Sequence, residues 1–159
     1  MEKELVSGIS FSKDEAKVSV SGLPDKPGVS ANIFGPLADA NINVDMIVQN
    51  ISQDGKRANV TFTLPQSELN KAVEILEKIK EQNDFQSLKT DEKVAKISAI
   101  GTGMRSQAGV ATKMFKALGE KNINIQAIST SEIKISVLIN QDFIELAVRT
   151  LHSAYGLDQ

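Results

Sequence analysis

The chain has 159 residues, a formal charge of -2, one histidine and no cysteine. That length suits one ordinary domain or two small domains of about 70 to 80 residues each. Without cysteine there can be no disulfide, thiol nucleophile or thiolate metal site, and a single histidine makes other metal sites unexpected. Near-neutral charge and 4% aromatic residues disfavour nucleic acid, and no apolar run is long enough to cross a bilayer. We therefore expect a cytoplasmic protein with no cofactor, no metal, and no membrane or nucleic-acid partner.

An internal repeat divides the chain. Gly28–Ile47 aligns without a gap with Gly109–Ile128, and both segments carry Gly-Val, Phe, Leu and Asn-Ile-Asn at matching positions. Upstream, Ala16–Gly22 aligns with Ala95–Gly101, and the loop between the aligned blocks is two residues longer in the second copy. This self-similarity predicts two copies of one structural unit.

The first copy is expected to fold in the order strand, helix, strand, strand, helix, strand. Val18 and Val20 alternate with polar neighbours, as in a half-buried strand, and Asp54-Gly55 is typical of a hairpin. Pro36 is expected to kink the first helix. The expected elements are a strand at Val18 and Val20, a helix with Val29, Ile33, Phe34 and Leu37, a strand that follows Ala40–Asn43 and reaches about Ser52, a strand at Arg57–Leu64, a helix opened by Pro65 with Leu69, Ala72, Val73, Leu76 and Ile79, and a strand at Phe85–Lys89.

The second copy lacks a fourth strand after Tyr155. We expect the N-terminal Leu5–Phe11 to supply it, which would make the first copy an insertion in the second. The fold class is then α+β, with two ferredoxin-like βαββαβ domains whose antiparallel sheets carry helices on one face. The domain bounds are 15–91 for the first, and 1–12 plus 92–159 for the second. Its other elements are strands at Val94–Ile100, Ile123–Thr130 and Ile133–Ile139, and helices at Ala108–Gly119 and Gln141–Ala154.

Each copy has a loop before its first helix, at Asp25–Gly28 and at Met104–Gly109. Free amide groups at a helix N-terminus suit an anion such as the carboxylate of an amino acid. A purely structural interpretation stays open, in which Asp25 caps the helix and Gly28 and Gly109 serve turn geometry or close packing.

Other polar segments have structural explanations. In Asn41-Ile42-Asn43 and Asn122-Ile123-Asn124, asparagine tolerates a left-handed backbone or bonds within the turn. Ser129–Glu132 is explained by a polar hairpin, with cation binding by Glu132 as the alternative. His152 has no serine or carboxylate arranged with it as in a nucleophilic triad, and Gly101-Thr102-Gly103 lacks the third glycine of a dinucleotide fingerprint. No catalytic residue is predicted.

Six segments of the chain match a known family: Ala16–Gly22, Asp25–Gly28, Leu37–Met46, Gln49–Ser52, Val60–Thr63 and Ile128–Leu138. They closely resemble the regulatory tail of bacterial aspartate kinase, a tandem pair of ACT domains. The resemblance covers essentially the whole chain. It implies an allosteric sensor of the end products of the aspartate pathway, with threonine and lysine as expected effectors and no kinase domain. It also implies a catalytic aspartate kinase subunit, or a fused kinase domain, as partner.

The resemblance implies two effector sites. Gln49 is expected to contact a ligand hydroxyl, and Asp25 or backbone carbonyls to hold an ammonium group. Gln107-Ala108 and Ala111 stand where family members that respond to both amino acids often have His-Pro and a threonine, which disfavours lysine. The threonine-type site would comprise Asp25, Lys26, Pro27, Gly28, Val29, Ser30, Ala31, Gln49, Asn124 and Ile125. The lysine-type site would comprise Asn43, Val44, Asp45, Met104, Ser106, Gln107, Gly109, Val110, Ala111, Ser131 and Glu132.

Effectors that join elements of both copies would favour one mutual arrangement of them, which makes binding regulatory. We also expect a homodimer, because pairing sheets side by side would cover their edges. Two alternatives stay open: an oligomerisation module that binds no ligand, and an ACT regulator of another amino-acid pathway. An enzyme is a distant third.

Overall fold

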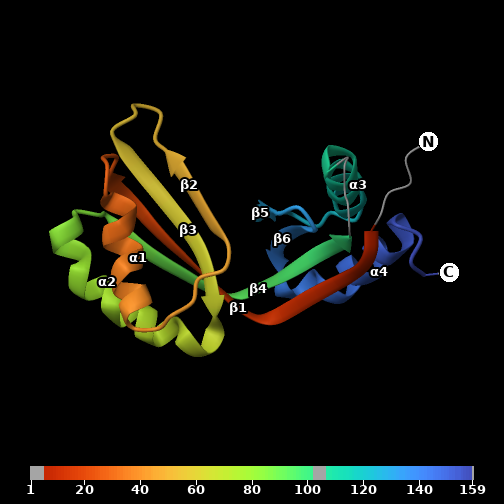
Figure 1. Ribbon diagram of the computed structural model, residues 1–159, viewed down its shortest axis with the longest axis horizontal. Coiled ribbons are helices and arrows are strands. Elements are labelled where there is room, and N and C mark those ends of the chain that lie inside the picture. The colour runs from red at the N-terminus through yellow and green to blue at the C-terminus, as the bar shows by residue number, and fades with distance from the viewer. Residues whose placement is uncertain (1–5, 102–106, 159) are drawn as a thin grey trace. The chain divides into compact units, whose positions relative to one another are not determined.

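The computed structural model of the chain describes residues 6–101 and 107–158. The chain divides into two compact units, and we call Asp14–Glu92 the central unit and Met1–Lys13 with Lys93–Gln159 the terminal unit. Two long strands, β1 (Val6–Pro24) and β4 (Ser87–Gly101), contribute to both units (Figure 1). None of the helices within the described ranges is long and apolar enough to span a membrane.

In the central unit the strands are ordered β2-β3-β1-β4, and β3 pairs antiparallel with both β1 and β2. The hairpin between β2 and β3 closes through the amide of Ser52, which donates to the carbonyl of Arg57 at 2.8 Å, and Gly55 takes a φ of 73° in its turn. The elements between the long strands are α1 (Val29–Asp39), β2 (Ile47–Ile51), β3 (Arg57–Pro65), a 3-10 turn η1 (Gln66–Glu68) and α2 (Leu69–Asn83).

The core of the central unit lies between the two helices and β1 and β3. Val29, Ile33 and Leu37 recur every four residues on α1, so one face of the helix is buried. Leu69, Ala72 and Leu76 recur after three and four residues on α2, so one face of this helix is buried too, and α2 contacts α1. Phe62 of β3 is fully buried, and its ring meets that of Phe34 edge-on, with centroids 5.3 Å apart.

The terminal unit has the corresponding strand order, β1-β4-β6-β5. The first part of β1 lies beside β4, where the Ser7 hydroxyl donates to the carbonyl of Ile100 at 3.2 Å. Val6 enters a core with Met114, Leu118 and Leu151 from the two helices. The other elements are α3 (Gln107–Glu120), β5 (Ala127–Thr130), β6 (Lys134–Asn140), a 3-10 turn η2 (Gln141–Phe143) and α4 (Ile144–Ala154).

The α+β class with two ferredoxin-like βαββαβ units is confirmed, but several elements differ from their expected extents. The strand expected at Leu5–Phe11 runs on without a break into the next strand, and Phe85–Lys89 and Val94–Ile100 likewise belong to one strand. Leu5 itself lies outside the described residues. The strand expected from Ile123 begins at Ala127 instead. Pro36 lies inside α1, which continues to Asp39.

Both Asn-Ile-Asn segments end their helices in the same way. Asn41 and Asn122 adopt left-handed φ values of 60° and 58°. The amides of the residues that follow, Ile42 and Ile123, donate back to carbonyls of the last helical turn at 3.0 Å. This is the left-handed helix terminus that asparagine tolerates, so that interpretation of the repeat is confirmed.

Candidate functional site

The loop between β1 and α1 comprises Asp25, Lys26, Pro27 and Gly28. Asp25, Lys26, Pro27 and Gly28 are all exposed, and the Asp25 amide donates to the carbonyl of Lys56 at 3.0 Å. Gly28 is the N-cap residue with a φ of 89°, a conformation that glycine adopts without strain. No side chain caps α1 among the described residues, so Asp25 does not act as the cap. The Val29 amide donates to the carbonyl of Lys26 at 3.3 Å, so the amides that a ligand could reach in the first turn of α1 are those of Ser30 and Ala31.

Ser30 and Gln49 meet at the exposed end of this loop. Ser30 lies in the first turn of α1, and its hydroxyl donates to Oε1 of Gln49 at 3.1 Å. Gln49 is an exposed residue of β2 and pairs with Val60 of β3, which fixes its position on the sheet. The structure thus brings Gln49 to the N-terminus of α1, where both hydrogen-bond donors and an acceptor are present. Such a combination can hold the carboxylate and the hydroxyl of a small polar ligand.

The remaining residues expected in the central unit lie between α1 and β2. Asn43 and Asp45 are exposed, whereas Val44 packs against the core. The Asp45 amide donates to the carbonyl of the buried Thr63 at 2.9 Å. This segment is thus tied to β3 through its backbone and keeps its polar side chains at the surface.

The residues expected in the terminal unit are only partly described. Met104 and Ser106 lie outside the described residues, and α3 begins at Gln107. Val110 is buried, and Ala111 packs against the core. Gly109, Asn124, Ser131 and Glu132 are exposed, and Ile125 is half-buried.

Ser131 belongs to the turn between β5 and β6. Its amide donates to the carbonyl of Lys134 at 2.8 Å, and its hydroxyl lies 3.5 Å from the same oxygen. Those contacts agree with a polar hairpin. Within the described ranges, no three histidine, aspartate or glutamate side chains gather as metal ligands would.

The pKa of Asp54 is lowered in the hairpin between β2 and β3. The Ser52 hydroxyl donates to its carboxylate at 2.6 Å, and the Lys56 amide donates at 3.0 Å; both bonds favour the charged form. Asp54 is fully exposed, so this shift is a property of the turn.

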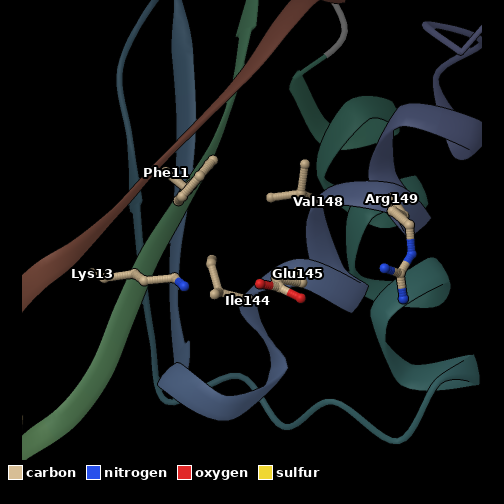
Figure 2. Close-up of a pocket in the computed structure, with 6 residues that line it drawn as sticks. All are labelled: Phe11, Lys13, Ile144, Glu145, Val148 and Arg149. Atoms are coloured by element: carbon tan, nitrogen blue, oxygen red, sulfur yellow. The ribbon is translucent and has the colours of Figure 1, made fainter.

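Two hollows stand out among the described residues, and only one of them includes a residue of the expected effector sets. One, of about 400 Å³, lies between α1 and α2 and has Ala31 of the expected threonine-type set in its wall. The other, of about 250 Å³, lies in the terminal unit between β1 and α4 (Figure 2), and we call it the α4 groove. The sequence pattern did not predict this groove, although Phe11 stands out as an apolar residue among the polar residues of Ser10–Lys13. The α4 groove is lined by Phe11, Lys13, Ile144, Glu145, Val148 and Arg149.

The chain matches a family of known proteins along most of its length. A family model described as the ACT domain matches residues 18–79 and 97–155. An aspartokinase of Helicobacter pylori is 52% identical over 159 residues, and an aspartate kinase of Pseudomonas fluorescens is 51% identical over 158. The chain spans 38% of the length of each of these relatives.

Solved structures match nearly the whole chain. A chain from a crystal structure of aspartokinase alpha and beta subunits is 48% identical, with a TM-score of 0.89, and the match covers 95% of this chain and 99% of that one. The ligand-free regulatory subunit of aspartate kinase from Thermus thermophilus is 35% identical, with a TM-score of 0.88, covering 94% and 98%. The isolated chain thus matches the regulatory part and is not the catalytic kinase. It belongs to the ACT-domain family, as the tandem ACT regulatory region of a bacterial aspartate kinase.

Proposed function

We propose that this regulatory module binds threonine at the start of α1 and thereby inhibits an aspartate kinase catalytic chain. The observation that carries the proposal is the hydrogen bond from Ser30 to Gln49, at a helix N-terminus that no side chain caps among the described residues. Lysine is the second proposed effector. It would use the corresponding loop of the terminal unit, where Met104 and Ser106 lie outside the described residues.

The chemistry of threonine fits this corner of the central unit. The amides of Ser30 and Ala31 in the first turn of α1 would donate to its carboxylate, which the positive end of the helix dipole also attracts. Its hydroxyl would donate to Oε1 of Gln49, which has two lone pairs and can accept from the ligand while it also accepts from Ser30. Asp25, exposed in the same loop, would hold the ammonium group.

Regulation requires that the effector bind one state of the module better than another. The proposed threonine-type set therefore also includes Asn124 and Ile125 of the terminal unit, as the resemblance implies. We further propose functional domains with bounds 15–91 and 1–12 plus 92–159, assembly as a homodimer, and a cytoplasmic location.

Calorimetry with threonine, lysine and valine tests the proposal. Valine has nearly the shape of threonine but no hydroxyl, so we expect it to bind at least about tenfold more weakly. Gln49→Ala should weaken threonine binding by about tenfold or more, because the hydroxyl and Ser30 both lose their acceptor. Asn50→Ala is the matched control on the same exposed strand and should leave affinity unchanged within about twofold. Asp25→Ala should also weaken binding.

An oligomerisation module that binds no ligand is the rival. Absence of heat and of any thermal shift with both threonine and lysine would favour it. Unchanged threonine affinity in Gln49→Ala would reject the site, and a preference for another amino acid in a screen would reject the effector.

A further inference from the structure

The hairpin between β2 and β3 (Figure 1) contains the one aspartate of the sequence that precedes a glycine, in Asp54-Gly55. The peptide nitrogen that follows an aspartate can attack its side-chain carboxyl group, and glycine favours the attack because it has no Cβ and bends freely. Asparagine reacts in the same way, but no asparagine of this chain precedes a glycine, and most precede isoleucine or valine, whose branched side chains hinder the attack. The sequence therefore places spontaneous isomerisation of the backbone at Asp54 first.

Burial does not protect this dipeptide. Asp54 and Gly55 are both exposed. Gly55 has a φ of 73°, and a Cβ built on it would meet no atom of the described residues within 4 Å. Exposed turns with small residues are the places where a folded backbone is most easily altered. Any protection of Asp54 must therefore come from the hydrogen bonds of the turn.

Hydrogen bonds engage both groups that would react. The Ser52 hydroxyl donates to Oδ1 of Asp54 at 2.6 Å, and the Lys56 amide donates to the same oxygen at 3.0 Å. The Gly55 amide, which supplies the attacking nitrogen, donates to the carbonyl of Ser52 at 2.9 Å. These bonds stabilise the ionised carboxylate and the protonated amide, whereas the reaction needs a protonated carboxyl group and a nitrogen that gives up its proton. The lowered pKa of Asp54 agrees with this protection.

We propose that Asp54 is the site at which this chain forms isoaspartate, and that the Ser52 hydroxyl slows the reaction by holding the carboxylate. The nitrogen of Gly55 forms a bond to Cγ of the protonated carboxyl group, and one carboxyl oxygen leaves as water with the carboxyl and amide protons. Water then opens the succinimide ring. Opening at the main-chain carbonyl gives isoaspartate with a free α-carboxylate, and opening at the other carbonyl restores aspartate. The reaction consumes no oxidant or reductant.

Isoaspartate lengthens the main chain of the turn by one carbon atom, because the chain then runs through Cβ and Cγ. The hairpin closes through the Ser52 amide, which donates to the carbonyl of Arg57 at 2.8 Å. That closure fixes the register in which Gln49 pairs with Val60. Isomerised chains should therefore lose pairing between β2 and β3 and displace Gln49. The reaction itself does not depend on the proposed function.

Ageing of the folded protein for several weeks in neutral buffer tests the proposal. Endoproteinase Asp-N cleaves before aspartate but not before isoaspartate, so the uncut peptide Asp45–Asn83, identified by electron-transfer fragmentation, measures the product. The other aspartates in the same digest are internal controls. We expect Asp54 to react before them, and Ser52→Ala to accelerate the reaction by about fivefold, the factor that corresponds to one hydrogen bond of ordinary strength. Ser52→Thr keeps the hydroxyl and should stay within about twofold of the wild type.

Two controls separate the hydroxyl from a general loosening of the hairpin. Asn59→Ala removes a different hydrogen bond of β3, to the Gly22 amide, and should leave the rate within about twofold. In guanidinium chloride, where the turn is absent, wild type and Ser52→Ala should react equally fast, and both faster than the folded wild type.

The outcomes test the site and the protection separately. Isoaspartate that appears first at another aspartate, or at none even in the unfolded chain, would overturn the site. Equal rates of folded wild type and Ser52→Ala would overturn the protection. An acceleration by Asn59→Ala as large as that by Ser52→Ala would also overturn it, because loosening of the sheet would then explain both.

Discussion

The side chain of Arg57 contacts both the backbone carbonyl and the side-chain carboxylate of Asp84. Nη1 of Arg57 donates to the Asp84 carbonyl at 3.2 Å and lies 3.3 Å from the carboxylate. The same nitrogen donates to the carbonyl of Gly22 at 3.1 Å, where the pairing of β1 with β3 shifts register. One guanidinium therefore joins the bulge of β1 to the end of α2, where Asp84 has a left-handed φ of 49°.

Replacing this arginine should destabilise the central unit. We expect Arg57→Ala to lower the free energy of unfolding by about 1 kcal/mol, since it loses two hydrogen bonds to backbone carbonyls at a partly exposed site. Lys78→Ala, which removes only an exposed pair with Glu74, should have almost no effect. Chemical denaturation measures both. Equal effects of the two substitutions would show that the hydrogen bonds of Arg57 do not contribute to the free energy of unfolding.

A buried hydroxyl pair in the terminal unit should show strong coupling. Ser98 and Ser136 face each other across β4 and β6, with 2.6 Å between their oxygens, and both are almost fully buried. Either single alanine substitution leaves one buried hydroxyl without its partner, at a cost of about 1 to 3 kcal/mol. The double variant should cost less than the sum of the two single ones. A double-mutant cycle by denaturation checks this, and additive costs would contradict it.

Alanine and glycine substitutions at the two left-handed asparagines, Asn41 and Asn122, should have opposite effects on stability. At Asn41 and Asn122, alanine should cost about 1 kcal/mol, because its Cβ disfavours positive φ. Glycine should be neutral or stabilising by up to about 1 kcal/mol. Asn43→Ala is the matched control outside the left-handed positions. Thermal melts report all of these, and a destabilising glycine at both sites would argue that the asparagine side chains have another role.

The stability that Asp54 gives to the hairpin between β2 and β3 should decrease in acid. Hydrogen bonding from Ser52 holds the pKa of Asp54 below its usual 3.8 in the folded state. Its carboxylate thus contributes stability that is fully present above the unfolded-state value and is lost as the pH falls through the folded-state value. The difference in Tm between wild type and Asp54→Asn should therefore shrink between about pH 6 and about pH 3. A constant difference over that range would show that the charge of Asp54 contributes nothing.

Periodicity predicted the class and order of the elements, because the buried residues recur at the spacings of helices and strands. It did not predict that β1 and β4 are continuous. Their middle portions, around Lys13-Asp14 and Asp91-Glu92, are charged and lack an apolar pattern. A strand keeps its extended form through backbone pairing, so such a run need not interrupt it.

The residues of the candidate effector site could be predicted only from the resemblance to a known family. Composition alone gives no reason for Ser30 and Gln49 to meet, since they lie 19 residues apart on different elements. Their contact depends on the register that places Gln49 opposite Val60. The α4 groove was only partly predictable: Phe11 stands out as an apolar residue among polar ones, but the sequence does not show which residues of α4 lie against it.

The long strands also set an order of folding during synthesis. All residues of the central unit have been synthesised once Glu92 is added, so this unit can fold after it emerges from the ribosome and before the last elements of the terminal unit do. The first part of β1 must wait for Val94–Gly101 and β6 before its sheet can assemble. Until then it is an unpaired edge that could recruit another nascent chain. Its serines, Ser7, Ser10 and Ser12, and its Lys13 make such premature pairing less favourable than an apolar strand would.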